Sequence, residues 1–188
     1  MNHKLSLFLS RRLIKMGAIQ QEHEEVYVYG FELIFSFLFC TATILIVSLI
    51  VHKVIEAIVF MILFVVLRQF TGGLHANTYL RCQICTVAGY LSVVFLSLTT
   101  QPSLVFHSIL LLLGAFTIIA IGPIESIHKP LTPQGRVRNK KIGTVLFVIS
   151  GTCGMITMSS YQEISNTIFY TLLLIIILMI IPCIGRRK

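Results

Sequence analysis

The stretch LIFSFLFCTATILIVSLIV, from Leu33 to Val51, holds 19 consecutive residues without a charged side chain. A helix of that length is enough to cross about 30 Å of hydrocarbon. Over the whole chain 56% of the residues are hydrophobic and only 12% are charged, whereas a soluble domain carries about 25% charged residues. A soluble fold of this size cannot bury so much apolar surface. The sequence therefore predicts an all-α integral membrane protein.

Further apolar segments follow the first one, and together they predict about six hydrophobic helices. They cover residues 54–67, 83–99, 103–121, 142–160 and 164–184. The first of these has only 11 uncharged residues between Glu56 and Arg68, a length that often indicates a re-entrant helix. Two architectures stay open: six spans, or four spans with two re-entrant segments.

A basic segment precedes the first span. An amphipathic helix is predicted over about residues 4–17, with Leu5, Leu9 and Leu13 on one side. This pattern is typical of a helix that rests on an anionic lipid surface. Membrane lipid is therefore an expected partner. We expect residues 1–188 to form a single membrane-embedded domain.

The positive charges favour one topology. The net charge of +8 comes from 15 Lys and Arg against seven Glu, with no Asp. These cations gather before the first span, between residues 129 and 141, and at the C-terminus, rather than on one soluble face, which argues against nucleic-acid binding. With cytoplasmic termini and six crossings, every cation except Lys53 lies in the cytoplasm. The sequence predicts a multi-pass cell-membrane protein with residues 68–85 at the cytoplasmic face.

That segment, RQFTGGLHANTYLRCQIC from Arg68 to Cys85, carries most of the reactive groups. A cysteine attacks as its thiolate, and a neighbouring histidine is the usual base, which makes Cys82 and His75 candidates for these roles. On one straight helix they would lie about 10.5 Å apart, so the chain must bend. Gly72-Gly73 permits such a bend, and Asn77 or Thr78 is a good N-cap for the next helix. Cys82 would then lie in a first turn, where the helix dipole favours a thiolate.

Other readings of the same residues stay open. Cys82-Gln83-Ile84-Cys85 is a Cys-x-x-Cys pair typical of redox dithiols, although no thioredoxin-like βαβ pattern surrounds it. A metal site would draw on His75, Cys82 and Cys85, which is fewer than the four ligands of a structural zinc, so no metal or other cofactor is predicted. Glu32, at the start of the first span, is either an interfacial residue or a functional one.

The chain resembles AgrB, the membrane peptidase of the accessory gene regulator quorum-sensing systems of Gram-positive bacteria. The resemblance rests on Arg68, Gly72-Gly73, His75-Ala76 and Cys82, with the family's spacing of seven between histidine and cysteine. Tyr29-Gly30-Phe31-Glu32, Pro123 and His128-Lys129-Pro130-Leu131 also follow the family pattern. The similarity covers nearly the whole chain.

The resemblance implies a cysteine endopeptidase. Cys82 would attack a small AgrD-like precursor peptide with His75 as base, releasing the precursor's charged C-terminal tail. An internal Cys or Ser of the precursor would then close a thiolactone or lactone ring, which matures an autoinducing peptide. The implied localisation is the cell membrane of a Gram-positive bacterium, and a homodimer is a further expectation.

Several residues receive auxiliary roles on this reading. Arg68, Gly72, Gly73, Asn77 and Glu32 are candidates to position the substrate or the oxyanion. A catalytic aspartate is impossible in a chain without Asp, so a third catalytic member, if there is one, would be Asn77, Gln69 or Glu32. The acidic tail of the precursor is expected to be attracted by Lys129, Arg136, Arg138, Lys140 and Lys141. The rival functions are a small transporter, whose intramembrane ionisable groups and repeats are scarce here, and a non-catalytic membrane adaptor.

Overall fold

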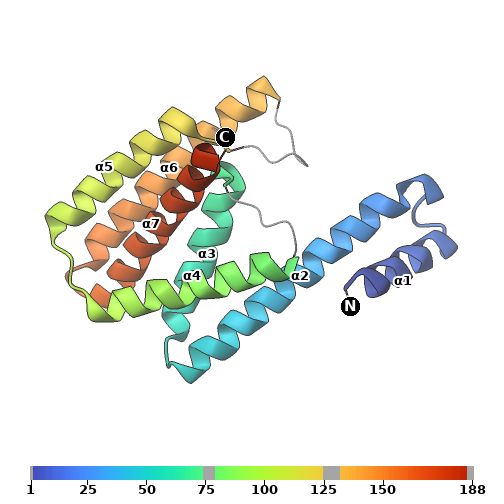
Figure 1. Cartoon of the computed structure of the whole chain (residues 1–188), viewed down its shortest axis with the longest axis horizontal. Helices are drawn as coiled ribbons and strands as arrows, with labels where there is room; N and C mark the ends of the chain where they lie inside the picture. The colour runs from blue at the N-terminus through green and yellow to red at the C-terminus, as the bar shows by residue number, and fades with distance from the viewer. Residues whose placement is uncertain (1, 74–78, 125–131, 186–188) are drawn as a thin grey trace. The chain divides into compact units, whose positions relative to one another are not determined.

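The computed structural model describes residues 2–73, 79–124 and 132–185, and it confirms an all-α chain. Within these residues the regular structure is helical apart from one isolated bridge between Gly72 and Ile124. Figure 1 shows the helices in chain order: α1 (Asn2–Lys15), η1 (Gln21–His23), α2 (Glu24–Ile50), α3 (Val54–Thr71), α4 (Tyr79–Thr99), α5 (Leu104–Ile121), α6 (Pro133–Thr157) and α7 (Gln162–Gly185).

Five helices of the described residues are long and apolar enough to cross a membrane, namely those within Gln21–Ile50, Val54–Thr71, Leu80–Thr99, Leu104–Ile121 and Gln162–Pro182. The second apolar segment, whose uncharged part is short, forms one continuous helix of 18 residues. The sixth expected segment lies in α6, whose first turns carry four cations. The chain is therefore a multi-pass helical membrane protein by length and composition, and the count of six crossings stays a prediction.

One boundary prediction was wrong. The helix predicted over residues 142–160 begins earlier, because residues 133–141 also belong to α6. The cause is a strong helix start: the Thr132 hydroxyl accepts a hydrogen bond from the Gly135 N–H (3.1 Å), and Pro133 follows as the first helical residue. A threonine N-cap before a proline at this position is a favoured way to begin a helix. The four cations of this segment consequently stand on a helix.

The chain divides into two compact units, Met1–Val47 and Ser48–Lys188. In the first unit α1 packs antiparallel to α2, because His3 contacts Glu32 (2.7 Å) while Arg11 contacts Glu24 (3.0 Å). A helix is thus present at Asn2–Lys15, and its place on a lipid surface stays a prediction. Its fully buried residues are the small Ser6 and Ser10, whereas Leu5 is 48% exposed.

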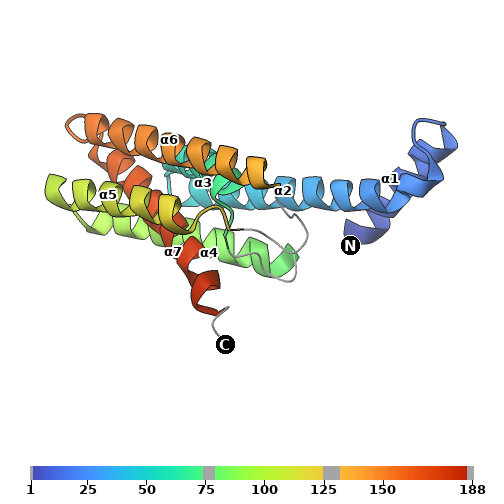
Figure 2. The ribbon, with the colours of Figure 1, turned by 90° about the horizontal axis from the view of Figure 1, so that it is seen from above.

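In the second unit α7 is the central helix and contacts α3, α4, α5 and α6. Figures 1 and 2 show α5, α6 and α7 side by side. The core of α7 includes the fully buried Leu172 and Met179. Glycines allow close helix approach: a Cβ on Gly114 would lie 2.3 Å from the Phe147 ring, and one on Gly151 would lie 2.4 Å from Leu111. Such small residues are typical of helix interfaces in membranes.

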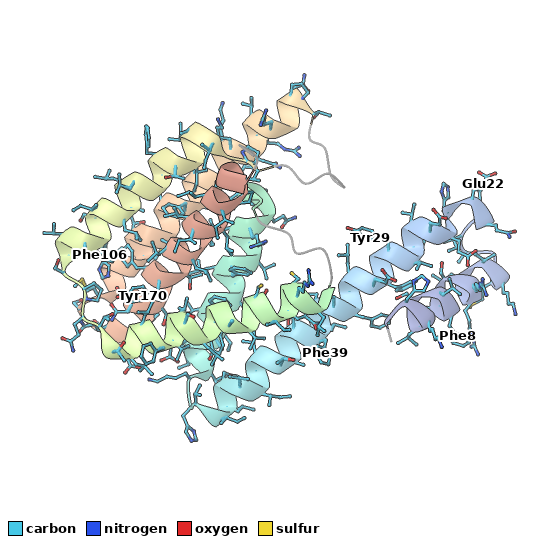
Figure 3. All side chains as sticks on the ribbon, in the orientation of Figure 1. Phe8, Glu22, Tyr29, Phe39, Phe106 and Tyr170 are labelled. Carbon is cyan, nitrogen blue, oxygen red and sulfur yellow. The ribbon has the colours of Figure 1, made fainter. Side chains whose placement is uncertain are left out.

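Polar side chains tie together the end of this unit where α3 and α7 begin. Lys53, just before α3, donates a hydrogen bond to Glu163 at the start of α7 and lies 3.5 Å from Glu56. Asn166 on α7 donates to the carbonyls of Ser97 (3.3 Å) and Thr100 (3.0 Å), at the end of α4. Tyr170, labelled on α7 in Figure 3, hydrogen-bonds the Thr100 hydroxyl.

Candidate active site

The bend expected at the double glycine is present. α3 ends at Thr71, and the Gly72 N–H still donates to the Arg68 carbonyl (3.0 Å). Gly72 then adopts φ +68° and ψ −149°, and Gly73 adopts φ +131°. Backbone angles of this kind are almost restricted to glycine. The chain therefore leaves the axis of α3 immediately before the segment that carries His75.

Two neighbouring segments hold this bend in place. The Ile124 N–H, from the chain after α5, donates to the Thr71 carbonyl (2.9 Å) and forms the bridge with Gly72. A Cβ on Gly72 would lie 2.0 Å from the Ile124 carbonyl oxygen, and one on Gly73 would lie 3.0 Å from that of Leu178 on α7. Both glycines are needed for space as well as for backbone conformation.

Cys82 lies where the sequence predicts it, in the first turn of α4, which begins at Tyr79. Its side chain is half-buried, and its carbonyl accepts a hydrogen bond from the Thr86 hydroxyl (2.9 Å). The first turn of a helix carries unpaired N–H groups and the positive end of the helix dipole, which favour an anion there. His75 and Asn77 lie outside the described residues, so the expected pairing of His75 with Cys82 stays a prediction.

Arg68 comes from the last turn of α3 and approaches the cysteines. Its guanidinium lies 5.3 Å from the centre of the Phe64 ring one turn earlier, in a cation–π arrangement. It also interacts electrostatically with the thiols of Cys82 and Cys85. Of the predicted site residues, Arg68 and Cys82 thus interact electrostatically.

Cys85 follows Cys82 by one helical turn. It is exposed, and both side chains are free thiols. Residues three apart on a helix face the same side, which places the two sulfurs on one face of α4. Among the described residues, no three His, Cys, Asp or Glu side chains lie together as a metal site requires.

Glu32 and Gln69 are two further candidates. Glu32 belongs to the first compact unit, where it contacts His3 across the α1–α2 pair. Gln69 is an exposed residue near the end of α3. The observed contact gives Glu32 a part in holding α1 against α2, and its role toward a substrate stays a prediction.

The basic residues expected to attract a tail have different surroundings. Lys140 donates a hydrogen bond to the Ile119 carbonyl at the end of α5 (2.8 Å), a favourable place for a cation. Arg138 and Lys141 line a shallow hollow on α6, and Arg136 is exposed beside them. Lys129 lies outside the described residues.

Sequence reasoning missed the partners that fix the site. The spacing of four between Phe64 and Arg68 is a signal for the cation–π contact, since such residues are neighbours on a helix. No comparable signal marks Ile124 or Leu178, because their contacts with Gly72 and Gly73 are made by backbone atoms from distant parts of the chain.

The chain resembles known proteins over most of its length. The family model described as Accessory gene regulator B matches residues 6–181. A putative AgrB-like protein of Clostridium perfringens (strain SM101) is 21% identical over 90% of this chain and 79% of its own length. The accessory gene regulator protein B of Staphylococcus intermedius is 26% identical over 83% of this chain and 74% of its own. No solved structure matches the chain with significance. Because the family model spans nearly all of the sequence, this chain belongs to the AgrB family of accessory gene regulator proteins.

Proposed function

We propose that this membrane protein is a cysteine endopeptidase that removes the C-terminal tail from an AgrD-like precursor and promotes closure of a thiolactone or lactone ring. Membership in the AgrB family puts the chain in an accessory gene regulator system. The observation that carries the proposal is Cys82, in the first turn of α4 and within electrostatic reach of Arg68. A thiol in such surroundings is a suitable nucleophile.

In the proposed reaction His75 takes the proton from Cys82, and the thiolate attacks the scissile carbonyl carbon. A C–S bond forms and the C–N bond breaks, while the leaving amine receives the proton from His75. The acyl group then sits on Cys82 as a thioester. A thiol or hydroxyl inside the precursor then gives its proton to His75 and attacks this thioester. The new bond closes the ring, the C–S bond to Cys82 breaks, and the Cys82 thiolate is restored.

Arg68 is proposed to stabilise negative charge in this reaction. Its guanidinium is held by the Phe64 ring and interacts with the Cys82 sulfur. The same charge suits the oxyanion of the tetrahedral intermediate, because that oxygen is bonded to the carbon that the Cys82 sulfur attacks. Gly72 and Gly73 act as positioning residues, since their contacts set the direction in which the chain enters the His75 segment.

The basic start of α6 is proposed to attract the acidic tail of the precursor. Arg136, Arg138 and Lys141 are exposed on this helix, whereas Lys140 is engaged with α5. Opposite charges raise the local concentration of a substrate, and salt screens the effect. Lys129 shares this proposed role, and the proposal puts the reactive site at the cytoplasmic face together with the basic residues.

The test is mass spectrometry of purified protein in lipid vesicles with a synthetic precursor that has an amphipathic N-terminus, a central Cys and an acidic tail. The wild type and Cys85→Ser are expected to form an acyl adduct and release the tail. Cys82→Ala and His75→Ala are expected to do neither. Circular dichroism spectra of all four proteins control for folding.

Two outcomes contradict the proposal. If folded Cys82→Ala still releases the tail, Cys82 is not the nucleophile. If the wild type acts on no precursor, including the peptide encoded beside its own gene, a transporter or a membrane adaptor becomes the better account.

A further inference from the structure

The Cys82–Cys85 pair is not explained by the proposed peptidase, which needs only one thiol. The two residues lie three apart at the start of α4, where their Cβ atoms are about 5–6 Å from each other by helix geometry. A disulfide requires a Cβ separation of about 3.5–4.5 Å. Closing the pair thus takes a movement of about 1–2 Å.

Cys82 to Cys85 are the fourth to seventh residues of α4. Tightening this single turn exchanges its i→i−4 hydrogen bonds for i→i−3 bonds, as often happens near a helix end. In a 3₁₀ turn, positions i and i+3 become eclipsed, which brings the two sulfurs together. Cys85 is exposed and Cys82 is half-buried, so Cys85 is open to small reagents.

The charge at this position favours oxidation. Arg68 interacts electrostatically with both thiols, and a cation next to a cysteine is typical of sites that react with peroxide. Cysteines that sense oxidants are typically accessible, close to positive charge and next to a second, resolving cysteine. Cys153 is also an exposed free thiol, but it lies in the apolar part of α6 without a cysteine one turn away.

We propose that Cys82 and Cys85 form a reversible disulfide when hydrogen peroxide reaches the site, and that this bond switches the protein off. The Cys82 thiolate attacks the peroxide and becomes a sulfenic acid, while the peroxide is reduced to hydroxide, which is then protonated to water. The Cys85 thiol then displaces water from the sulfenic acid, and the S–S bond forms. A dithiol reductant of the cytoplasm reverses the step by thiol–disulfide exchange and is itself oxidised. The loss of activity rests on the proposed function, whereas formation of the bond does not.

The test oxidises reduced protein in lipid vesicles with hydrogen peroxide, blocks the remaining thiols with N-ethylmaleimide and maps the peptides by mass spectrometry. The wild type is expected to yield a Cys82–Cys85 crosslinked peptide that dithiothreitol reduces. In Cys85→Ser, Cys82 is expected to pass to the irreversible sulfinic acid. Cys153→Ser is the matched control and is expected to behave like the wild type. If oxidised wild type contains no Cys82–Cys85 bond, the proposal is wrong.

A second arm measures release of the precursor tail. After peroxide, dithiothreitol is expected to restore the activity of the wild type but not that of Cys85→Ser. A wild type that keeps full activity with the disulfide formed contradicts the switch. Formation of the disulfide in a protein that processes no precursor even when reduced would instead refute the proposed function and leave the disulfide standing.

Discussion

At the scale of single residues, Gly72 fixes the position of the candidate site. Its backbone conformation is one that side chains other than hydrogen resist, and its Cα faces the Ile124 carbonyl. Any larger residue must displace the chain that leads to His75. The double glycine is therefore a structural requirement of the site, and we expect substitutions there to be poorly tolerated.

Gly72→Ala is expected to destabilise the protein by roughly 2–5 kcal/mol, the sum of backbone strain and overpacking. Gly17→Ala separates the two causes, because Gly17 has φ +69° but a Cβ added there would meet nothing within 4 Å. It is expected to cost only about 1–2 kcal/mol. Thermal unfolding followed by circular dichroism measures both, and equal losses in the two variants would contradict the role of Ile124.

His107 is the other residue with a clear individual effect. It is fully buried, it stacks on Phe169 at 3.9 Å between ring centres, and neither ring nitrogen has a hydrogen-bond partner within the described residues. A buried polar atom without a partner costs about 1–3 kcal/mol. The His107 ring is thus well packed, but its two nitrogens are buried without hydrogen bonds.

His107→Phe keeps the ring stack and removes the polar atoms, so we expect it to stabilise the protein by about 1 kcal/mol. His107→Ala leaves a cavity and is expected to cost about 3 kcal/mol. Phe116→Ala, an exposed residue of the same helix, serves as the control with a change near zero. Denaturation in mixed micelles measures these differences, and a destabilised His107→Phe would indicate a bound water or ligand on the nitrogens.

At the scale of helices, Lys53 joins the start of α3 to the start of α7. It donates to Glu163 and lies 3.5 Å from Glu56. The pKa of Lys53 is raised above its ordinary value of 10.5, chiefly by the hydrogen bond to Glu163, while burial opposes the rise and the charge of Glu56 adds to it. Lys53 is 20% exposed and Glu163 is 53% exposed, so solvent screening keeps the contribution small.

Lys53→Met is expected to lower the free energy of unfolding by about 1 kcal/mol near neutral pH. Because the folded pKa is raised, this stabilisation is complete below pH 10.5 and disappears as pH rises through the folded value. Melting curves of the wild type and Lys53→Met should therefore converge only above that pH. Arg138→Met, which removes an exposed cation on α6, is the control. A difference that vanishes already near neutral pH would exclude this ion pair as its source.

At the scale of the whole molecule, the distribution of cations predicts how the helices cross the membrane. If α3 crosses, Gln69 and Gln134 lie on the cytoplasmic side and His52 lies outside. If α3 is re-entrant, Gln69 returns to the outer side with His52. The two architectures that the sequence leaves open thus place the exposed Gln69 on opposite sides of the membrane.

Single cysteines at His52, Gln69 and Gln134, in a variant without the native cysteines, test this topology. With a membrane-impermeant maleimide added to intact cells, His52→Cys is expected to react, whereas Gln69→Cys and Gln134→Cys should react only after the cells are opened. Labelling of Gln69→Cys in intact cells would place the candidate site on the outer side and would contradict the cytoplasmic proposal.

The sequence by itself determined the class of protein, most helix positions and the bend before His75, because long uncharged runs, a paired glycine and N-cap residues act locally. Local signals also explain the one boundary that was wrong, since the Thr132-Pro133 start of α6 precedes the predicted residues 142–160. What only the tertiary structure decided are the contacts between distant segments: Ile124 and Leu178 against the glycines, Arg68 near two thiols, and Glu163 with Lys53. These depend on how α3, α4, α5 and α7 pack, and a linear pattern of hydrophobicity specifies which faces are apolar but not which faces meet.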